Sequence, residues 1–187
     1  EMIEGHLKSL GMWYGRGDHR PISRTVLNAI YAWNRLQDNQ TISYGDVQYI
    51  YNQIVAKGRL KRGAKTFSDE DKDKIYTLDI LKKDHGLLVD GQWYEVMNKI
   101  SEYDVAYIRR LLDLGEDLQK EPRIKTSTIH QAKGGECDNV VVLTDIGKIV
   151  YKSYTKNPDD EHRVFYVAVT RAKENLYIVD PQTTNFY

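Results

Sequence analysis

The sequence predicts an α/β fold in which a helical segment interrupts a layer of strands and helices. Three observations support this class: helical periodicity in the first half, β-branched apolar runs near the C-terminus, and a helix between two such runs. The 187 residues suffice for a hydrophobic core. The 27 basic and 27 acidic residues balance, which excludes a strongly basic nucleic-acid-binding protein. Any contact with nucleic acid must therefore come from a local patch.

The first half of the chain has the pattern of amphipathic helices. Serine and threonine residues precede the apolar periodic segments, as expected of helix caps, and acidic residues follow one of them. Residues from about 37 to 120 are therefore predicted to form a helical unit with little strand character. Helices are predicted after Pro21–Ser23, after Thr41–Ser43, after Ser68–Asp71, over Trp93–Ile100 and over Val105–Leu114.

The last third of the chain changes to strand patterns. Ile124–Ile129 predicts a strand, and the unbroken apolar run Val140–Leu143 is typical of a strand buried on both faces of a parallel sheet. Asp159–Lys173 predicts a helix with acids in its first turn and bases in its last. Leu176–Val179 predicts a final strand, so the order strand, strand, helix, strand indicates an α/β layer.

A loop rich in polar side chains follows the first of these strands. In an open α/β sheet, ligands bind beyond the carboxyl ends of the strands, and glycine lets backbone approach a ligand closely. Its basic side chains can donate to phosphate or stack on a base, and its glutamate can accept from a sugar hydroxyl. An ordinary solvated turn explains the same composition equally well. The residues are Thr128, His130, Lys133, Gly134, Gly135 and Glu136.

The helix predicted over 159–173 carries an arginine on its apolar stripe. Val164, Val167 and Ala168 lie along one line at helical spacing, and Arg171 continues it. Either this arginine extends past the edge of the core to solvent, or it projects into a cleft to bind an anion. Its fixed fork of donors suits a phosphate. The spacing alone leaves both interpretations open.

Together these two blocks resemble motifs V and VI of the UvrD/Rep-type superfamily-one DNA helicases. The resemblance is strong over residues 123–180 and weaker over Leu7–Leu36. Gly135 and Cys137 depart from the family pattern, which has an aliphatic and an aromatic residue at these places. The matching residues are Thr128, His130, Lys133, Gly134 and Glu136 in motif V, and Glu161, Arg163, Tyr166, Val167, Ala168, Thr170, Arg171 and Ala172 in motif VI.

The resemblance implies a domain order. A RecA-like domain, of the type found in P-loop NTPases and called 2A, would have a parallel sheet flanked by helices. A small helical 2B-like insertion would interrupt it. Residues 1–36 would form the first part of 2A, 37–120 the insertion, and 121–187 the remainder with motifs V and VI. The insertion would be much shorter than in the best-known members of the family.

The resemblance also implies roles for individual residues. Arg171 would be the arginine finger on the ATP γ-phosphate, a group that stabilises charge during phosphoryl transfer. Gly134 and Glu136 would join it in binding ATP, with the glutamate on the ribose. The remaining assignments are single-stranded DNA contacts by Thr128, His130 and Lys133, and support of motif VI by Arg163, Tyr166 and Thr170.

A phosphate-cradling loop of the form G-x-x-x-x-G-K-[ST] is missing from the sequence. Gly58–Thr66 approaches this pattern, but Ala64 separates Gly63 from Lys65. We therefore expect the chain alone to hydrolyse no ATP. The Mg²⁺ ligands and helicase motifs I to IV are expected before Glu1, on an N-terminal RecA-like domain of the same polypeptide. Residues 57–65 predict a solvated basic loop, with contact to a nucleic-acid backbone as the alternative.

The favoured hypothesis is the C-terminal part of an ATP-dependent DNA helicase that moves along single strands and meets single-strand/duplex junctions in DNA repair or replication. Its rival is a non-enzymatic RecA-like module that binds nucleic acid or docks a protein. We expect a monomeric, cytoplasmic protein of bacterial, archaeal or phage origin. No apolar run approaches membrane-spanning length, so no contact with a membrane is expected. The single cysteine, Cys137, fits a reducing compartment, and its spacing from the five histidines predicts no metal site. The three tryptophans are expected in the core: Trp13, Trp33 and Trp93.

Overall fold

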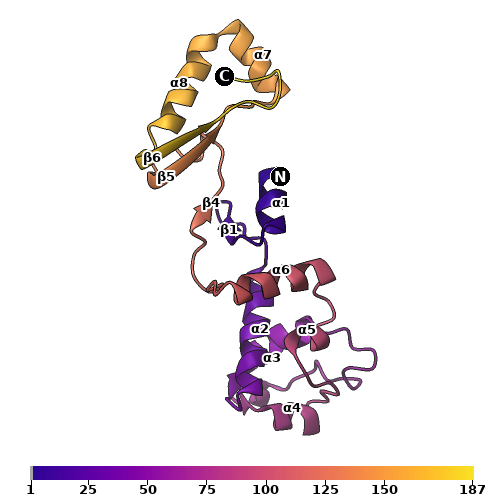
Figure 1. Cartoon of the computed structure of the whole chain (residues 1–187). Coiled ribbons are helices and arrows are strands. Elements are labelled where there is room, and N and C mark those ends of the chain that lie inside the picture. The colour runs from indigo at the N-terminus through magenta and orange to yellow at the C-terminus, as the bar shows by residue number, and fades with distance from the viewer. Residues whose placement is uncertain (1) are drawn as a thin grey trace. The chain divides into compact units, whose positions relative to one another are not determined.

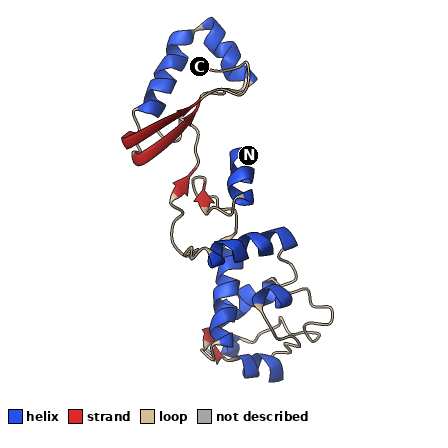
Figure 2. Cartoon of the chain, viewed as in Figure 1, coloured by secondary structure: helices blue, strands red, loops and turns tan. Residues whose placement is uncertain are grey.

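The computed structural model describes residues 2–187, which form two compact units divided in sequence between Lys125 and Thr126. Both units contain helices and strands (Figures 1 and 2), so the predicted mixed α/β class is confirmed. Within residues 2–187 the strands form three separate two-stranded sheets and do not join into a larger one. The pairs are β1 (Tyr14–Gly15) with β4 (Ile124–Lys125), β2 (Ile42–Ser43) with β3 (Ile75–Tyr76), and β5 (Cys137–Leu143) with β6 (Ala172–Val179).

The first unit is mainly helical, as its sequence predicts. Ser23 caps its longest helix by accepting from the Val26 amide, and Ser43 forms a reciprocal capping box with Asp46. Ser68 forms the same box with Asp71, yet the helix that follows is only a single 3-10 turn. The helical elements are α1 (Met2–Ser9), α2 (Arg24–Gln37), α3 (Tyr44–Asn52), η1 (Asp69–Asp71), α4 (Leu78–Lys83), α5 (Trp93–Val96) and α6 (Glu102–Asp113).

One hydrophobic core unites the first unit. It includes Trp13, Trp33 and Trp93, which are all buried as predicted, and the Trp33 indole N–H donates to the Gly91 carbonyl at 3.0 Å. Helix α2 packs against α3 and α5. Apolar residues on both sides of position 36 therefore share this core, while the division of the chain into 2A and 2B parts stays a prediction.

The first unit also brings together two distant segments of the chain. Strands β1 and β4 are parallel neighbours, with Tyr14 opposite Ile124 and Gly15 opposite Lys125. The helical elements α2 to α6 lie between them in sequence. The strand predicted over Ile124–Ile129 is therefore only two residues long, because its partner β1 also ends after two residues and a strand needs a partner for its hydrogen bonds.

The second unit contains the parallel pair β5 and β6, with α7 (Lys148–Lys156) and α8 (Pro158–Val169) between them in sequence. Helix α7 packs against α8, and α8 contacts β5. The prediction that Val140–Leu143 is buried on both faces is wrong: Val142 is buried, but Val141 is 63% exposed. The reason is that β6 is its one neighbouring strand among the described residues.

Helix α8 ends earlier than the sequence pattern indicates. Its acidic first turn is present, but the helix stops at Val169 instead of continuing to Lys173. The Thr170 hydroxyl contacts the carbonyls of Tyr166 and Val167, and the chain then enters β6 at Ala172. Tertiary pairing with β5 thus overrides the continuation of the helical stripe through Arg171.

Candidate functional site

The residues of both motif-like blocks lie in the second unit. The first block, Thr128–Glu136, is a series of tight turns rather than an extended strand end. Amide groups of Ala132 and Gly135 donate back to the carbonyls of Thr128 and Ala132, each at 3.1 Å. Gly134 has φ +83°, a left-handed conformation that strains other residues. A glycine is therefore required at this position of the loop, whereas Gly135 has an ordinary conformation.

A threonine and a glutamine fix the start of this loop. The Thr128 hydroxyl accepts from the Gln131 amide, while the Gln131 side-chain oxygen accepts from the Thr128 amide and hydroxyl, all at 3.3 Å. Sequence reasoning missed Gln131. A threonine followed three residues later by a glutamine is the spacing of a reciprocal cap, and this was the available signal.

His130 and Lys133 project from the turns into solvent. Both residues are exposed, and no hydrogen bond or ion pair involves either side chain in the part of the chain that the structure describes. The Lys133 amide donates to the His130 carbonyl at 3.4 Å, which holds the two residues within one turn. This arrangement can present an ammonium and an imidazole together to an anionic or aromatic ligand.

Glu136 stands at the entrance to β5. Its carboxylate lies 3.7 Å from the Lys173 ammonium, and both side chains are more than half exposed. An exposed pair at this distance contributes little free energy. The carboxylate is therefore available to accept from a ligand hydroxyl. Lys173 lies on β6, where the strand pairing brings it to Glu136, and the predicted helix through 173 gave no indication of this contact.

Arg171 joins the two blocks. Its guanidinium donates to the Val167 carbonyl at 2.9 Å, to the Thr170 hydroxyl at 3.0 Å and to the Gly135 carbonyl at 3.3 Å. The Arg171 carbonyl in turn accepts from the Cys137 amide at 3.0 Å. Among residues 2–187 no carboxylate forms an ion pair with this arginine. Its charge is thus held by neutral acceptors beside the glycine pair.

The residues predicted to support motif VI differ in what they contact. Thr170 bonds directly to Arg171. Tyr166 supplies a backbone carbonyl to Thr170, but the residue itself is 67% exposed. Arg163 is also exposed, with Asp160 3.5 Å away on the same helix as its ion-pair partner. The structure therefore brings together Gly135, Thr170 and Arg171, while the side chains of Arg163 and Tyr166 extend into solvent.

The model of the UvrD-like helicase C-terminal domain matches residues 34–182. The chain belongs to this family. The match contains both motif-like blocks and begins too late to test the weaker resemblance over Leu7–Leu36. No match was found among curated proteins or among solved structures.

Two further properties of this UvrD-like domain concern metals and membranes. In the described part of the chain, no three residues among His, Cys, Asp and Glu lie together so as to hold a metal ion. Across the same residues, none of the helices combines the length and apolar character needed to cross a bilayer.

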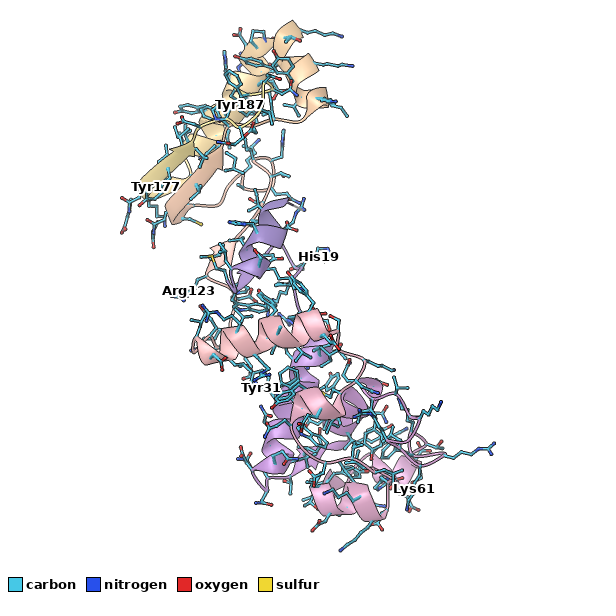
Figure 3. All side chains as sticks on the ribbon, turned by 45° about the vertical axis from the view of Figure 1, so that its right-hand side comes forward. His19, Tyr31, Lys61, Arg123, Tyr177 and Tyr187 are labelled. Atoms are coloured by element: carbon cyan, nitrogen blue, oxygen red, sulfur yellow. The ribbon has the colours of Figure 1, made fainter. Side chains whose placement is uncertain are left out.

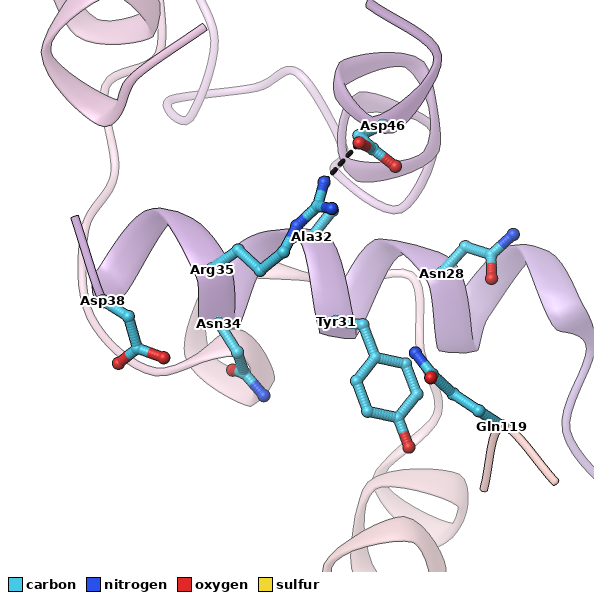
Figure 4. Close-up of a pocket in the computed structure, with 8 residues that line it drawn as sticks. All are labelled: Asn28, Tyr31, Ala32, Asn34, Arg35, Asp38, Asp46 and Gln119. Carbon is cyan, nitrogen blue, oxygen red and sulfur yellow. Dashed lines mark hydrogen bonds and ion pairs between the residues drawn. The ribbon is translucent and has the colours of Figure 1, made fainter. Parts of the chain in front are cut away.

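A separate hollow of about 380 Å³ lies on helix α2 of the first unit (Figure 4). Arg35 reaches across it to Asp46, and Tyr31 and Gln119 line its other end. None of the motif residues contributes to this hollow. Its one arginine is already paired, so it offers no free cation to a phosphate.

Proposed function

We propose that the chain is the C-terminal, RecA-like part of an ATP-dependent DNA helicase that moves along single-stranded DNA. The observation that supports this most is the position of Arg171, whose guanidinium joins the end of motif VI to the glycine pair of motif V. No carboxylate among residues 2–187 neutralises this guanidinium, so its charge is available to an anion. Neutral carbonyls hold it, and a phosphate is a stronger acceptor than they are.

The proposed nucleotide contacts use three residues of the second unit. ATP supplies the phosphoryl group whose transfer to water releases the free energy for movement. Arg171 would leave the Gly135 carbonyl and donate to the γ-phosphate, where it stabilises the charge that develops in the transition state. Glu136 would exchange its weak contact with Lys173 for a ribose hydroxyl, and Gly134 would let backbone approach the nucleotide. An N-terminal RecA-like domain would hold Mg²⁺.

The same contacts suggest how DNA and nucleotide binding could be coupled. Thr128, His130 and Lys133 would bind single-stranded DNA from the loop that ends at Gly135. When Arg171 moves from Gly135 to the phosphate, this loop loses one of its hydrogen bonds and can shift along the strand. Such ordering and release of a loop by a γ-phosphate is a known type of switching transition.

The apolar surface of the second unit supports the RecA-like part of the proposal. Side chains on one face of β5 and on both faces of β6 are exposed, among them Val141, Tyr177 (Figure 3) and Ile178. Parallel strands are normally covered on both faces. Further strands and helices of a RecA-like sheet would bury these side chains in the complete protein.

The decisive experiment measures DNA-stimulated ATP turnover by the full-length protein with Arg171→Ala. We expect turnover to fall by about 10³-fold or more, while affinity for single-stranded DNA changes by no more than a few-fold. Arg123→Ala is the matched control, because it removes an exposed arginine whose partner is Glu116. Unchanged turnover in Arg171→Ala would refute the arginine finger. Absence of turnover in the wild type would favour the non-enzymatic module.

A further inference from the structure

The helical part of the first unit contains a long stretch without acidic residues. After Asp46 the next carboxylate in the sequence is Asp69. Residues 57–65 between them hold two arginines and three lysines, and we call this segment the basic loop. The overall charge of the chain is zero, so this concentration of positive charge is local. The cations of the loop are Lys57, Arg59, Lys61, Arg62 and Lys65.

The backbone of the basic loop is anchored to the unit. Leu60 is buried and forms a β-bridge with Leu87. The Lys61 amide donates to the Gly86 carbonyl at 2.8 Å, and the Leu88 amide donates to the Arg59 carbonyl at 2.9 Å. These bonds hold the loop in one conformation, so its charges are presented from a fixed frame (Lys61 is labelled in Figure 3). Fixed charges bind an anion at a lower entropic cost than mobile ones.

Two of the five cations serve the structure. The Arg59 guanidinium donates to the carbonyls of Glu95 and Val96, and the Lys65 ammonium donates to the Ile54 carbonyl at 3.2 Å. Lys57, Lys61 and Arg62 are exposed. These three side chains form no ion pair with any carboxylate in residues 2–187.

The neighbouring lysines of the same unit behave differently. Lys72 and Lys74 pair with Asp69 and Asp71 at 2.6 Å and 2.9 Å, and Lys82 pairs with Asp90. The contrast shows that these carboxylates of the first unit pair with lysines outside the basic loop. The positive charge of the basic loop is therefore not neutralised within the unit.

One further cation extends the uncompensated charge. Burial lowers the pKa of Lys65, and the positive charge of Lys99 lowers it further. The Lys99 amide donates to the Gln53 carbonyl at 3.1 Å, next to the Ile54 carbonyl that accepts from the Lys65 ammonium. Lys99 is exposed and, in the described chain, has no carboxylate partner. An anion bound here would relieve the repulsion between these ammonium groups.

We propose that the basic loop, together with Lys99, binds the phosphodiester backbone of nucleic acid as a contact separate from motif V. The choice of nucleic acid over an acidic polypeptide rests on the proposed helicase function. The loop holds no aromatic side chain for stacking and no amide side chain for reading a base edge. Its contribution is therefore independent of sequence and strongly dependent on salt.

The test compares the 187-residue chain with the triple variant Lys57→Gln, Lys61→Gln, Arg62→Gln. Fluorescence anisotropy measures affinity for a labelled single-stranded oligonucleotide and for the corresponding duplex across a salt series. We expect affinity for at least one probe to fall by about tenfold or more at low salt. The slope of log K against log salt should decrease by about three, roughly one per removed charge. The probe that loses affinity identifies the form of nucleic acid bound.

The matched control is the triple variant Lys72→Gln, Lys83→Gln, Lys120→Gln, which removes the same charge from exposed lysines outside the basic loop. It should bind both probes with an affinity within about twofold of the wild type, because these lysines lie outside the proposed surface. Loss of their weak ion pairs should leave the fold intact. Equal losses in the two triple variants would overturn the proposal, as would an unchanged salt slope. Affinity for polyglutamate is measured in the same way. If the basic-loop variant lost affinity for polyglutamate but not for either oligonucleotide, the proposal would also be overturned, because the surface would then bind an acidic protein.

This outcome is independent of the test of Arg171. If DNA binding depends on the basic loop while the full-length protein hydrolyses no ATP, the helicase proposal fails and the nucleic-acid surface stands. If ATP turnover depends on Arg171 while the basic-loop variant binds DNA normally, the proposed nucleic-acid surface fails and the helicase proposal stands.

Discussion

The two compact units differ most in how they bury apolar residues. In the first unit a continuous core runs from Trp13 to Leu118. In the second unit the buried hydrophobic residues are Val142 and Ala168, and most apolar side chains of β5 and β6 are exposed. Burial of apolar surface contributes about 25 cal/mol per Å², so the first unit should hold most of the folding free energy. The motif residues thus lie in the unit that is expected to be less stable, which is typical of elements that move during function.

The largest change in stability is expected for Trp33→Ala in the first unit, and it tests the contrast between the two units most directly. Trp33 is fully buried and donates a hydrogen bond to the Gly91 carbonyl, so its removal leaves both a cavity and an unpaired acceptor. We expect the free energy of unfolding to fall by about 3–5 kcal/mol, measured by urea denaturation.

The corresponding change in the second unit is Tyr177→Ala on β6. Tyr177 is 54% exposed, and we expect the free energy of unfolding to fall by less than about 1 kcal/mol. Similar losses for the two variants would show that the second unit has a core of its own and would remove the contrast between the units.

The helix caps provide a smaller test of the same contrast. Ser43 caps α3 through a complete capping box, and Ser43→Ala should destabilise the first unit by about 1 kcal/mol. Asn157 precedes α8 without a side-chain cap, so Asn157→Ala should cost only a few tenths of a kcal/mol. Thermal unfolding of both variants measures the difference. A larger effect at Asn157 would indicate that α8 depends on its contact with Asp160.

The smallest expected effect concerns acid pH and the second unit. The Asp145 carboxylate accepts from the Thr183 hydroxyl at 2.6 Å and from the Gln182 amide at 2.9 Å, and these bonds hold its pKa below the ordinary value of 3.8. A lowered pKa means that this stabilisation is present above the ordinary value and is lost as pH falls through the lowered one. NMR spectra should show residues 182–187 detaching from Asp145 in that range.

Asp145→Asn is the control for this titration. It removes the charge and should abolish the pH dependence of the same amide signals. Persistence of the transition in Asp145→Asn would assign it to another carboxylate.

The sequence predicted where α2, α3 and α8 begin better than where α8 ends. Ser23 and Ser43 mark helix starts through hydrogen bonds within three residues, so their effect is local and readable. The helix predicted through Lys173 ends at Val169, because Ala172 begins β6 and pairs with Cys137 of β5. These two residues are 35 positions apart, so no local pattern indicates their pairing. Gln131 and Lys173 were missed as neighbours of the site for different reasons. The signal for Gln131 is its local spacing from Thr128 and was overlooked. The contact of Lys173 with Glu136 depends on strand pairing and has no local signal.

The sequence by itself determined the mixed α/β class, the membership of the UvrD-like family and the identity of the residues in the two motif blocks. It did so because caps, periodicity and motif spacing depend on residues close together in the chain. Only the tertiary structure decided that Arg171 rests on the Gly135 carbonyl and that Val141 of β5 is exposed. Both depend on which strands lie side by side, and hydrogen bonds between distant segments leave no periodic mark in the sequence.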